Sequence, residues 1–354
     1  MSIVFLLLII IIFSNASYVK DDSLHSNYLN KENTTTINGI FVLLVFMSHA
    51  TQYMTLSGPY HSFYIFISGF LNQAIVVTFM FYSGYGLMEG IKRKGNDYTD
   101  TFPKKIIKLW LQFDAAILLF LLTNWSLGTF PTFKEILLAL SSWGGIGNSN
   151  WYITAMLLLY FFMYLSFKVS KNNWVSLIIL LTLTMLCVFF FMKIGRPKYT
   201  YNTMICFSFG VGYSLVHNKI EKLLSNSLIF ISSILIPLIL MIYTRPTIYQ
   251  NIKFYSIWMI CFMILILLFT MKINIKNSFL HFLGTQVFTV YILQRIPMMI
   301  LAYLGYNNRH FTFFTVSFLV TLILAILFDK YILPQIDKLI LFISNKQIKN
   351  KATI

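Results

Sequence analysis

The stretch TINGIFVLLVFMSHA, residues 36–50, decides the fold because it combines a long apolar run with two polar side chains. Asn38 and His49 are about three helical turns apart, so a helix would carry both on one face, about 16 Å apart along its axis. An ionisable side chain at bilayer depth is costly and normally functional, and a histidine can exchange a proton near neutral pH. We therefore expect a membrane helix with Asn38 near one surface and His49, a candidate catalytic residue, near the middle.

The composition predicts the same class for the whole chain. Of the 354 residues, 58% are hydrophobic and only 11% are charged, unlike a soluble globular protein. Apolar stretches of about 18 residues recur, each long enough to cross a bilayer core. The sequence thus predicts an all-α, polytopic transmembrane bundle of about ten core spans. They are residues 39–56, 68–90, 106–123, 150–168, 174–192, 200–217, 226–243, 254–271, 279–301 and 312–329.

The basic residues give an orientation. If the first span begins in the cytoplasm, 19 basic residues lie inside and 8 lie outside, which satisfies the positive-inside rule. The net charge of +16 is spread between apolar spans instead of forming one patch. It therefore fits anionic membrane lipids as partners and not nucleic acid. We expect one membrane domain, residues 36–330, followed by a basic cytoplasmic tail, residues 331–354.

The N-terminal segment, residues 1–35, contains a hydrophobic run and a polar linker. The run at residues 3–13 resembles a signal-peptide core but lacks the usual basic residues before it. Cleavage after it would invert every later span, against the charge distribution. We expect an additional helix here, with its N-terminus outside.

Three further motifs place polar groups in or beside spans. In FYSGYG, residues 81–86, the small residues allow close helix packing or, with Ser83 and Tyr85, a polar site. The lysine-rich segment that follows, with Lys104 and Lys105, fits either topogenic charge or the recruitment of a polyanionic donor. NSNWYI, residues 148–153, places Trp151 at the start of a span, and YILQRIP, residues 291–297, places Tyr291, Gln294 and Arg295 late in one.

Four of the five arginines, Arg196, Arg245, Arg295 and Arg309, fall on the predicted outer side. A guanidinium group can hold a phosphate, a carboxylate or sugar hydroxyls. The alternative is that each one extends to the membrane interface without a ligand. As a set, they favour an outward-facing polar site.

Metal chemistry is not predicted. The three cysteines, Cys187, Cys206 and Cys261, lie in apolar runs without ligand spacing. The sequence has no His-Glu-x-x-His motif and no glycine-rich phosphate loop on a strand. We expect no metal and no bound cofactor.

These motifs together resemble the integral-membrane acyltransferase family of the acyltransferase 3 type. The matching features are the Asn38-to-His49 segment, FYSGY at 81–85, KKIIK at 104–108, NWYI at 150–153 and LG…YILQ at 283–294, in the family's order. The resemblance covers about residues 36–330. It implies transfer of a short acyl group, typically acetyl, from cytoplasmic acyl-CoA to hydroxyls of a cell-surface or lipid-linked polysaccharide. The expected location is the bacterial plasma membrane.

The resemblance also implies roles for individual residues. His49 would be the general base. Asn38, Ser83, Tyr85, Lys104 and Lys105 would bind the donor, and Trp151, Arg196, Tyr291, Gln294 and Arg295 would bind the acceptor. Neither the acceptor sugar nor the oligomeric state follows from the sequence.

Two departures from the family pattern leave an alternative open. The family usually has a basic residue, most often arginine, with ten residues between it and the histidine, where this chain has Asn38. Many members also have histidine where this chain has Gln294. An amide can hydrogen-bond but cannot form an ion pair. The alternative is therefore a non-enzymatic polysaccharide exporter or flippase of similar architecture.

Overall fold

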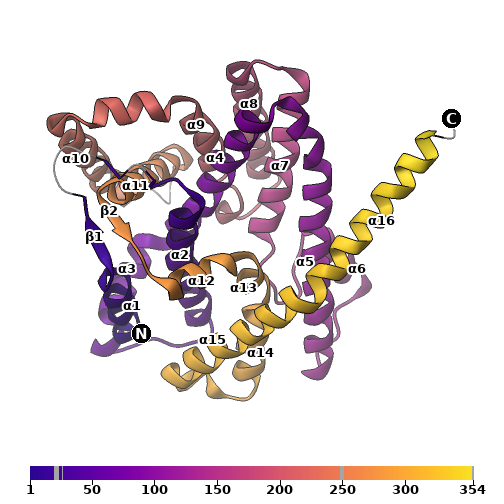
Figure 1. The fold of residues 1–354 in the computed structure, drawn as a ribbon. Helices are drawn as coiled ribbons and strands as arrows, with labels where there is room; N and C mark the ends of the chain where they lie inside the picture. The colour runs from indigo at the N-terminus through magenta and orange to yellow at the C-terminus, as the bar shows by residue number, and fades with distance from the viewer. Residues whose placement is uncertain (20–23, 26, 248–250, 353–354) are drawn as a thin grey trace. The chain divides into compact units, whose positions relative to one another are not determined.

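The computed structural model describes residues 1–19, 24–25, 27–247 and 251–352, and this part of the chain is almost entirely helical (Figure 1). It divides into two compact units. The first unit comprises Met1–Val45, Ser57–Thr99 and Leu165–Thr285, and the second comprises Phe46–Leu56, Asp100–Tyr164 and Gln286–Ile354.

The first unit holds most of α2 and two short strands. Its elements are α1 (Ser2–Phe13), β1 (Ala16–Tyr18), α2 (Lys31–Thr51), α3 (Pro59–Leu71), α4 (Val77–Lys94), α8 (Asn173–Lys193), α9 (Ile205–Leu224), α10 (Ser227–Thr244), α11 (Ile252–Lys272), β2 (Ile273–Ile275) and α12 (Ser278–Thr285). The strands form an antiparallel pair in which Ala16 lies opposite Ile275, and this pair was not expected from the sequence (Figure 1). It ties the segment after α1 to the end of α11.

The second unit holds the last turn of α2 and seven further helices. They are α5 (Phe102–Ser126), α6 (Phe133–Leu140), α7 (Trp151–Val169, which ends in the first unit), α13 (Val287–Leu293), α14 (Arg295–Tyr303), α15 (His310–Leu327) and α16 (Leu333–Ala352). Short 3₁₀ turns and one π-helical turn, Phe328–Ile332, connect several of the helices in the two units.

Eight helices in the described part of the chain are long and apolar enough to cross a membrane. They are Lys31–Thr51, Gln73–Lys94, Asp97–Ser126, Trp151–Val169, Asn173–Lys193, Ser227–Thr244, Ile252–Lys272 and His310–Ile343. Ser278–Thr285 and Val287–Tyr303 would form a ninth if the break between them is bridged. The prediction of a helical membrane bundle is therefore confirmed.

The predicted count of ten spans is not confirmed. The span expected at residues 200–217 is a helix, α9, but it is shifted toward Lys219, Glu221 and Lys222, which make it too charged to count as a span. The expected N-terminal helix, α1, is present with 12 residues, or about 18 Å. A span needs about 20 residues, so α1 is too short to cross a bilayer.

Helix α2 begins earlier than the sequence predicts. It starts at Lys31, inside a polar segment, because the side chain of Asn30 accepts a hydrogen bond from the backbone N–H of Asn33 at 2.8 Å and satisfies a donor at the helix start. It ends at Thr51. His49 therefore lies in the last turn of the helix and not near its middle.

Glycines allow α4 and α9 to pack closely in the first unit. A Cβ atom on Gly84 of α4 would overlap the backbone oxygen of Phe207, and one on Gly210 of α9 would overlap that of Phe81. The two backbones therefore touch directly, as small residues permit in membrane helices. Gly84 thus confirms the close packing expected from FYSGYG. Gly86 does not take part in this packing, because a Cβ there would meet nothing within 4 Å.

Candidate functional site

The last turn of α2 is fixed in the second unit by aromatic packing. The ring of Phe46 lies 5.4 Å from that of Phe314 and 5.2 Å from that of Phe318, both on α15 and both in edge-on contact. Phe46 is fully buried. One turn further along the same helix lies His49, of which only 8% is exposed.

The His49 imidazole lies at one end of a series of aromatic rings. Its centre is 6.1 Å from the ring of Tyr291 on α13, which is 5.3 Å from the ring of Tyr152 on α7. Trp151 follows, 6.0 Å from Tyr152. The Nδ1 atom of His49 is buried and has no hydrogen-bond partner within the described residues. This nitrogen is therefore available to a substrate.

Two polar neighbours adjoin the imidazole. The side chain of Gln294 interacts with it, while the Nε2 atom of Gln294 donates to the backbone oxygen of Tyr291 at 3.1 Å. Gln294 is fully buried, so the fold fixes its position. Arg295 is the charged neighbour of His49.

Arg295 is held by three side chains. Its Nε atom donates to Ser149 Oγ at 2.6 Å, Nη1 to the Tyr53 hydroxyl at 3.4 Å, and Nη2 to Gln52 Oε1. Gln52 and Tyr53 follow directly after α2. A guanidinium group carries five N–H donors, so two remain for a ligand. Arg295 can therefore both fix the end of α2 and bind an anion or a developing negative charge beside His49.

Of the residues singled out in the sequence, the structure thus places five in or beside the aromatic series and the polar neighbours of His49: His49, Trp151, Tyr291, Gln294 and Arg295. Four further neighbours, Gln52, Tyr53, Ser149 and Tyr152, were not expected from the sequence. Two of these, Ser149 and Tyr152, lie inside the NSNWYI motif, so the motif itself was the available signal. The other two follow His49 closely, but only the fold shows that they hold Arg295.

Other candidate residues belong to the first unit. These are Asn38, Ser83, Tyr85 and Arg196. The Oδ1 atom of Asn38 is buried without a hydrogen-bond partner in the described residues. The ring of Tyr85 stacks on that of Phe81 at 6.4 Å. Burial lowers the pKa of the Arg196 guanidinium from its usual value.

Lys104 and Lys105 belong to the second unit, in the first turn of α5. Lys104 is exposed, whereas the ammonium group of Lys105 lies 5.1 Å above the ring of Phe102. Lys108, one turn further on, forms an ion pair with Asp337 of α16 at 2.5 Å. Of these three lysines, Lys104 is therefore the one that a solute can reach most easily.

No cluster of three or more histidine, cysteine, aspartate or glutamate side chains that could hold a metal ion occurs in the part of the chain that the structure describes. Cys187, Cys206 and Cys261 are buried free thiols.

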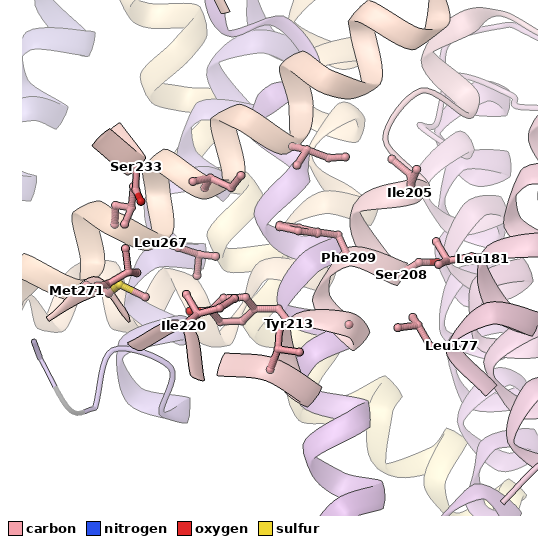
Figure 2. Close-up of a pocket in the computed structure, with 16 residues that line it drawn as sticks. Leu177, Leu181, Ile205, Ser208, Phe209, Tyr213, Ile220, Ser233, Leu267 and Met271 are labelled. Atoms are coloured by element: carbon pink, nitrogen blue, oxygen red, sulfur yellow. The ribbon is translucent and has the colours of Figure 1, made fainter. Parts of the chain in front are cut away.

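A separate cavity of about 540 Å³ lies in the first unit, between α8, α9, α10 and α11 (Figure 2). Its walls are aliphatic and aromatic, and the only polar side chains among them are Ser208, Tyr213 and Ser233. Figure 2 shows Leu177 and Leu181 on one side of the space and Leu267 and Met271 on the other. Its described lining includes no histidine, lysine, arginine, aspartate or glutamate.

These features define the class of protein as a helical membrane bundle. The site in its second unit combines a buried histidine, an adjacent arginine and a row of aromatic rings. A family model described as an acyltransferase domain matches residues 36–330, which is most of the chain. The chain therefore belongs to the acyltransferase 3 family, as its motifs predicted. Comparison with curated proteins and with solved structures gave no match.

Proposed function

We propose that the protein is a membrane-embedded O-acyltransferase that moves an acyl group, acetyl in the simplest case, from cytoplasmic acyl-CoA to hydroxyls of a cell-surface or lipid-linked polysaccharide. Membership of the acyltransferase family supports the reaction class. The observation that carries the proposal is the buried Nδ1 atom of His49, which no protein group occupies. A polar nitrogen left unpaired in this way costs free energy unless a substrate uses it.

In this mechanism the neutral imidazole of His49 accepts the proton of an acceptor hydroxyl. The hydroxyl oxygen attacks the thioester carbonyl, the C–S bond breaks, and the imidazolium returns the proton to the leaving thiolate. The products are the O-acyl ester and free CoA. A base positioned in this way contributes roughly a hundred- to ten-thousand-fold in rate.

Arg295 would assist at the same place. Its two remaining N–H donors can stabilise the oxyanion that forms when the thioester carbonyl is attacked. In the family pattern a basic residue stands at position 38, and Asn38 cannot supply that charge. Arg295, a charged neighbour of His49, can supply it.

The donor and acceptor would reach His49 from opposite sides. With Lys31 in the cytoplasm, α2 ends at the outer side, so an acyl group has to travel the roughly 16 Å of helix between Asn38 and His49. Asn38, Ser83, Tyr85, Lys104 and Lys105 are the proposed donor-binding residues. Trp151, Arg196, Tyr291, Gln294 and Arg295 are proposed for the acceptor glycan. The proposed location is the bacterial plasma membrane, in contact with its lipids.

Mass spectrometry of surface glycans tests the proposal. Cells that produce the wild-type protein should carry an acyl-sized mass that cells without it lack. His49→Gln keeps the polarity but removes the proton-accepting range, so acylation should fall by about a hundredfold or more while membrane insertion persists. His25→Gln, in the first unit, is the matched control and should acylate normally.

The exporter alternative predicts a different result. If His49→Gln leaves the acyl mass unchanged but the amount of surface glycan falls when the protein is deleted, the chain exports a polysaccharide and the acyl-transfer mechanism is wrong.

A further inference from the structure

A second polar site lies in the first unit and shares no residue with the His49 site. It is a cavity of about 570 Å³ between the segment that precedes α2, helix α4 and helix α9. We call it the Tyr82 pocket, and its defining residues are Tyr28, Tyr82, Tyr85, Arg93, His217 and Glu221. It lies where α4 and α9 end in the basic side chains Lys92, Arg93, Lys94 and Lys222.

Two hydrogen-bonding groups of this pocket have no protein partner among the described residues. Only 8% of Tyr82 is exposed. Its hydroxyl is buried and has no hydrogen-bond partner within the described residues. The Nδ1 atom of His217 lies 3.0 Å from the backbone oxygen of Ser214. Since a carbonyl can only accept, Nδ1 carries the proton, and Nε2 of the neutral ring is left as a hydrogen-bond acceptor.

A hydrogen-bonded chain fixes the opposite wall. The Tyr28 hydroxyl donates to Glu221 Oε1 at 2.9 Å and lies 2.7 Å from the hydroxyl of Tyr213. Burial, followed by the effects of Tyr213 and Glu221, raises the pKa of Tyr28 well above its usual value. Tyr28 therefore stays protonated as a donor, and Tyr213 must donate to it.

The charge of the pocket favours an anion. Arg93 and Lys31 are exposed at the pocket, and neither forms an ion pair or hydrogen bond with a described residue. Glu89 is already neutralised by Lys92 at 2.6 Å. Two available cations thus face one remaining carboxylate, that of Glu221.

Helix α9 separates this pocket from the apolar cavity. Tyr213 and Ile220 lie on the side of α9 that lines the cavity in Figure 2, whereas His217 and Glu221 line the Tyr82 pocket. The alkyl chain of a ligand would fit the apolar cavity, whereas the Tyr82 pocket suits a polar ligand. Gly86 lines the pocket with open space in front of it.

From these features we infer that the Tyr82 pocket binds the phosphate-bearing pantetheine arm of the acyl donor. This inference rests on the proposed function. Arg93 and Lys31 would hold the phosphate, since guanidinium and ammonium groups are the usual phosphate partners. The amide N–H and hydroxyl groups of the arm would donate to His217 Nε2, and its carbonyls would accept from the hydroxyl of Tyr82.

Equilibrium binding of unacylated CoA to the purified full-length protein tests this assignment without requiring catalysis. Tyr82→Phe removes one hydroxyl that has no protein partner, so it should not impair folding. It should weaken CoA binding about three- to tenfold, the loss expected for one hydrogen bond. Arg93→Gln should weaken it about tenfold or more, less so at high salt.

A steric variant and a control complete the set. Gly86→Leu would project a side chain into open space in the pocket, so CoA binding should be lost while thermal stability is maintained or increased. Tyr243→Phe, which also removes a hydroxyl but lies exposed on α10, should bind like the wild type.

The outcomes separate the inference from the proposed function. If wild type binds CoA and the Tyr82, Arg93 and Gly86 variants bind it equally well, the pocket assignment is overturned and the donor proposal stands. If wild type does not bind CoA, both are overturned. Binding of phosphatidylglycerol in nanodiscs, lost in the same variants while CoA binding is unchanged, would assign the pocket to a lipid headgroup instead.

Discussion

The guanidinium group of Arg295 donates a hydrogen bond to Gln52, three residues after His49, and so joins α14 to the end of α2. The same group reaches Ser149 Oγ at 2.6 Å and the Tyr53 hydroxyl at 3.4 Å. One side chain thus sets the position of the helix end that carries His49. Any acid–base role of His49 depends on this arrangement.

Replacing Arg295 with lysine should therefore lower acylation, although the positive charge is kept. A lysine ammonium cannot span three separate acceptors, because it lacks the planar fork of arginine. We expect kcat for glycan acylation to fall by about tenfold or more, with a smaller change in donor KM. Arg309→Lys is the control, since Arg309 is exposed and its guanidinium group lies over the ring of Tyr306. Equal activity of the two variants would remove Arg295 from the mechanism.

The contact between α4 and α9 yields a prediction about stability. Gly84→Ala places a methyl group against the backbone oxygen of Phe207, which cannot move aside as a flexible side chain would. We expect a loss of about 1–3 kcal/mol in the free energy of unfolding, seen as a lower midpoint of thermal unfolding in detergent.

Gly86→Ala is the matched control for this change, because a Cβ at Gly86 meets nothing within 4 Å on the same helix. It should leave the unfolding midpoint unchanged or raise it slightly. Equal midpoints for the two variants would show that the helices do not pack as closely as described.

Close packing at Gly84 and its absence at Gly86 could be predicted from the sequence only in part. FYSGYG predicts close helix packing somewhere in the motif, but Gly84 and Gly86 are equivalent by composition. Only the position of α9 distinguishes them. In the same way, the YILQRIP motif predicts polar groups late in a span, but not that Arg295 would reach Gln52 and Ser149.

The boundaries of α2 were mispredicted for a local reason. Hydrophobicity alone begins the helix at the apolar run, whereas the Asn30 side chain caps it eight residues earlier. The class of fold was predictable because apolar runs of span length are a strong signal. Hydrophobicity alone did not show that α9 would extend into a charged end and so differ from a membrane span.

The orientation can be tested by labelling single cysteines in intact cells. The native thiols are buried, so background labelling with a membrane-impermeant thiol reagent should be low. Lys94→Cys, at the exposed end of α4, should label only after permeabilisation, whereas Lys198→Cys should label in intact cells. The reverse pattern would place the basic ends of α4 and α9 outside, away from cytoplasmic CoA.

The last prediction concerns the lysines at the start of α5. If they recruit the phosphates of CoA, Lys104→Gln should raise the donor KM more than it lowers kcat, because it removes attraction and not chemistry. Lys105→Gln should have a smaller effect, since its ammonium group already lies over the ring of Phe102. The effect should shrink as salt is added, because exposed charges are screened over about 8 Å at physiological ionic strength. Lys134→Gln, exposed on the predicted outer side, should leave the donor KM unchanged. A donor KM that Lys104→Gln does not alter would leave these lysines with a role in membrane orientation alone.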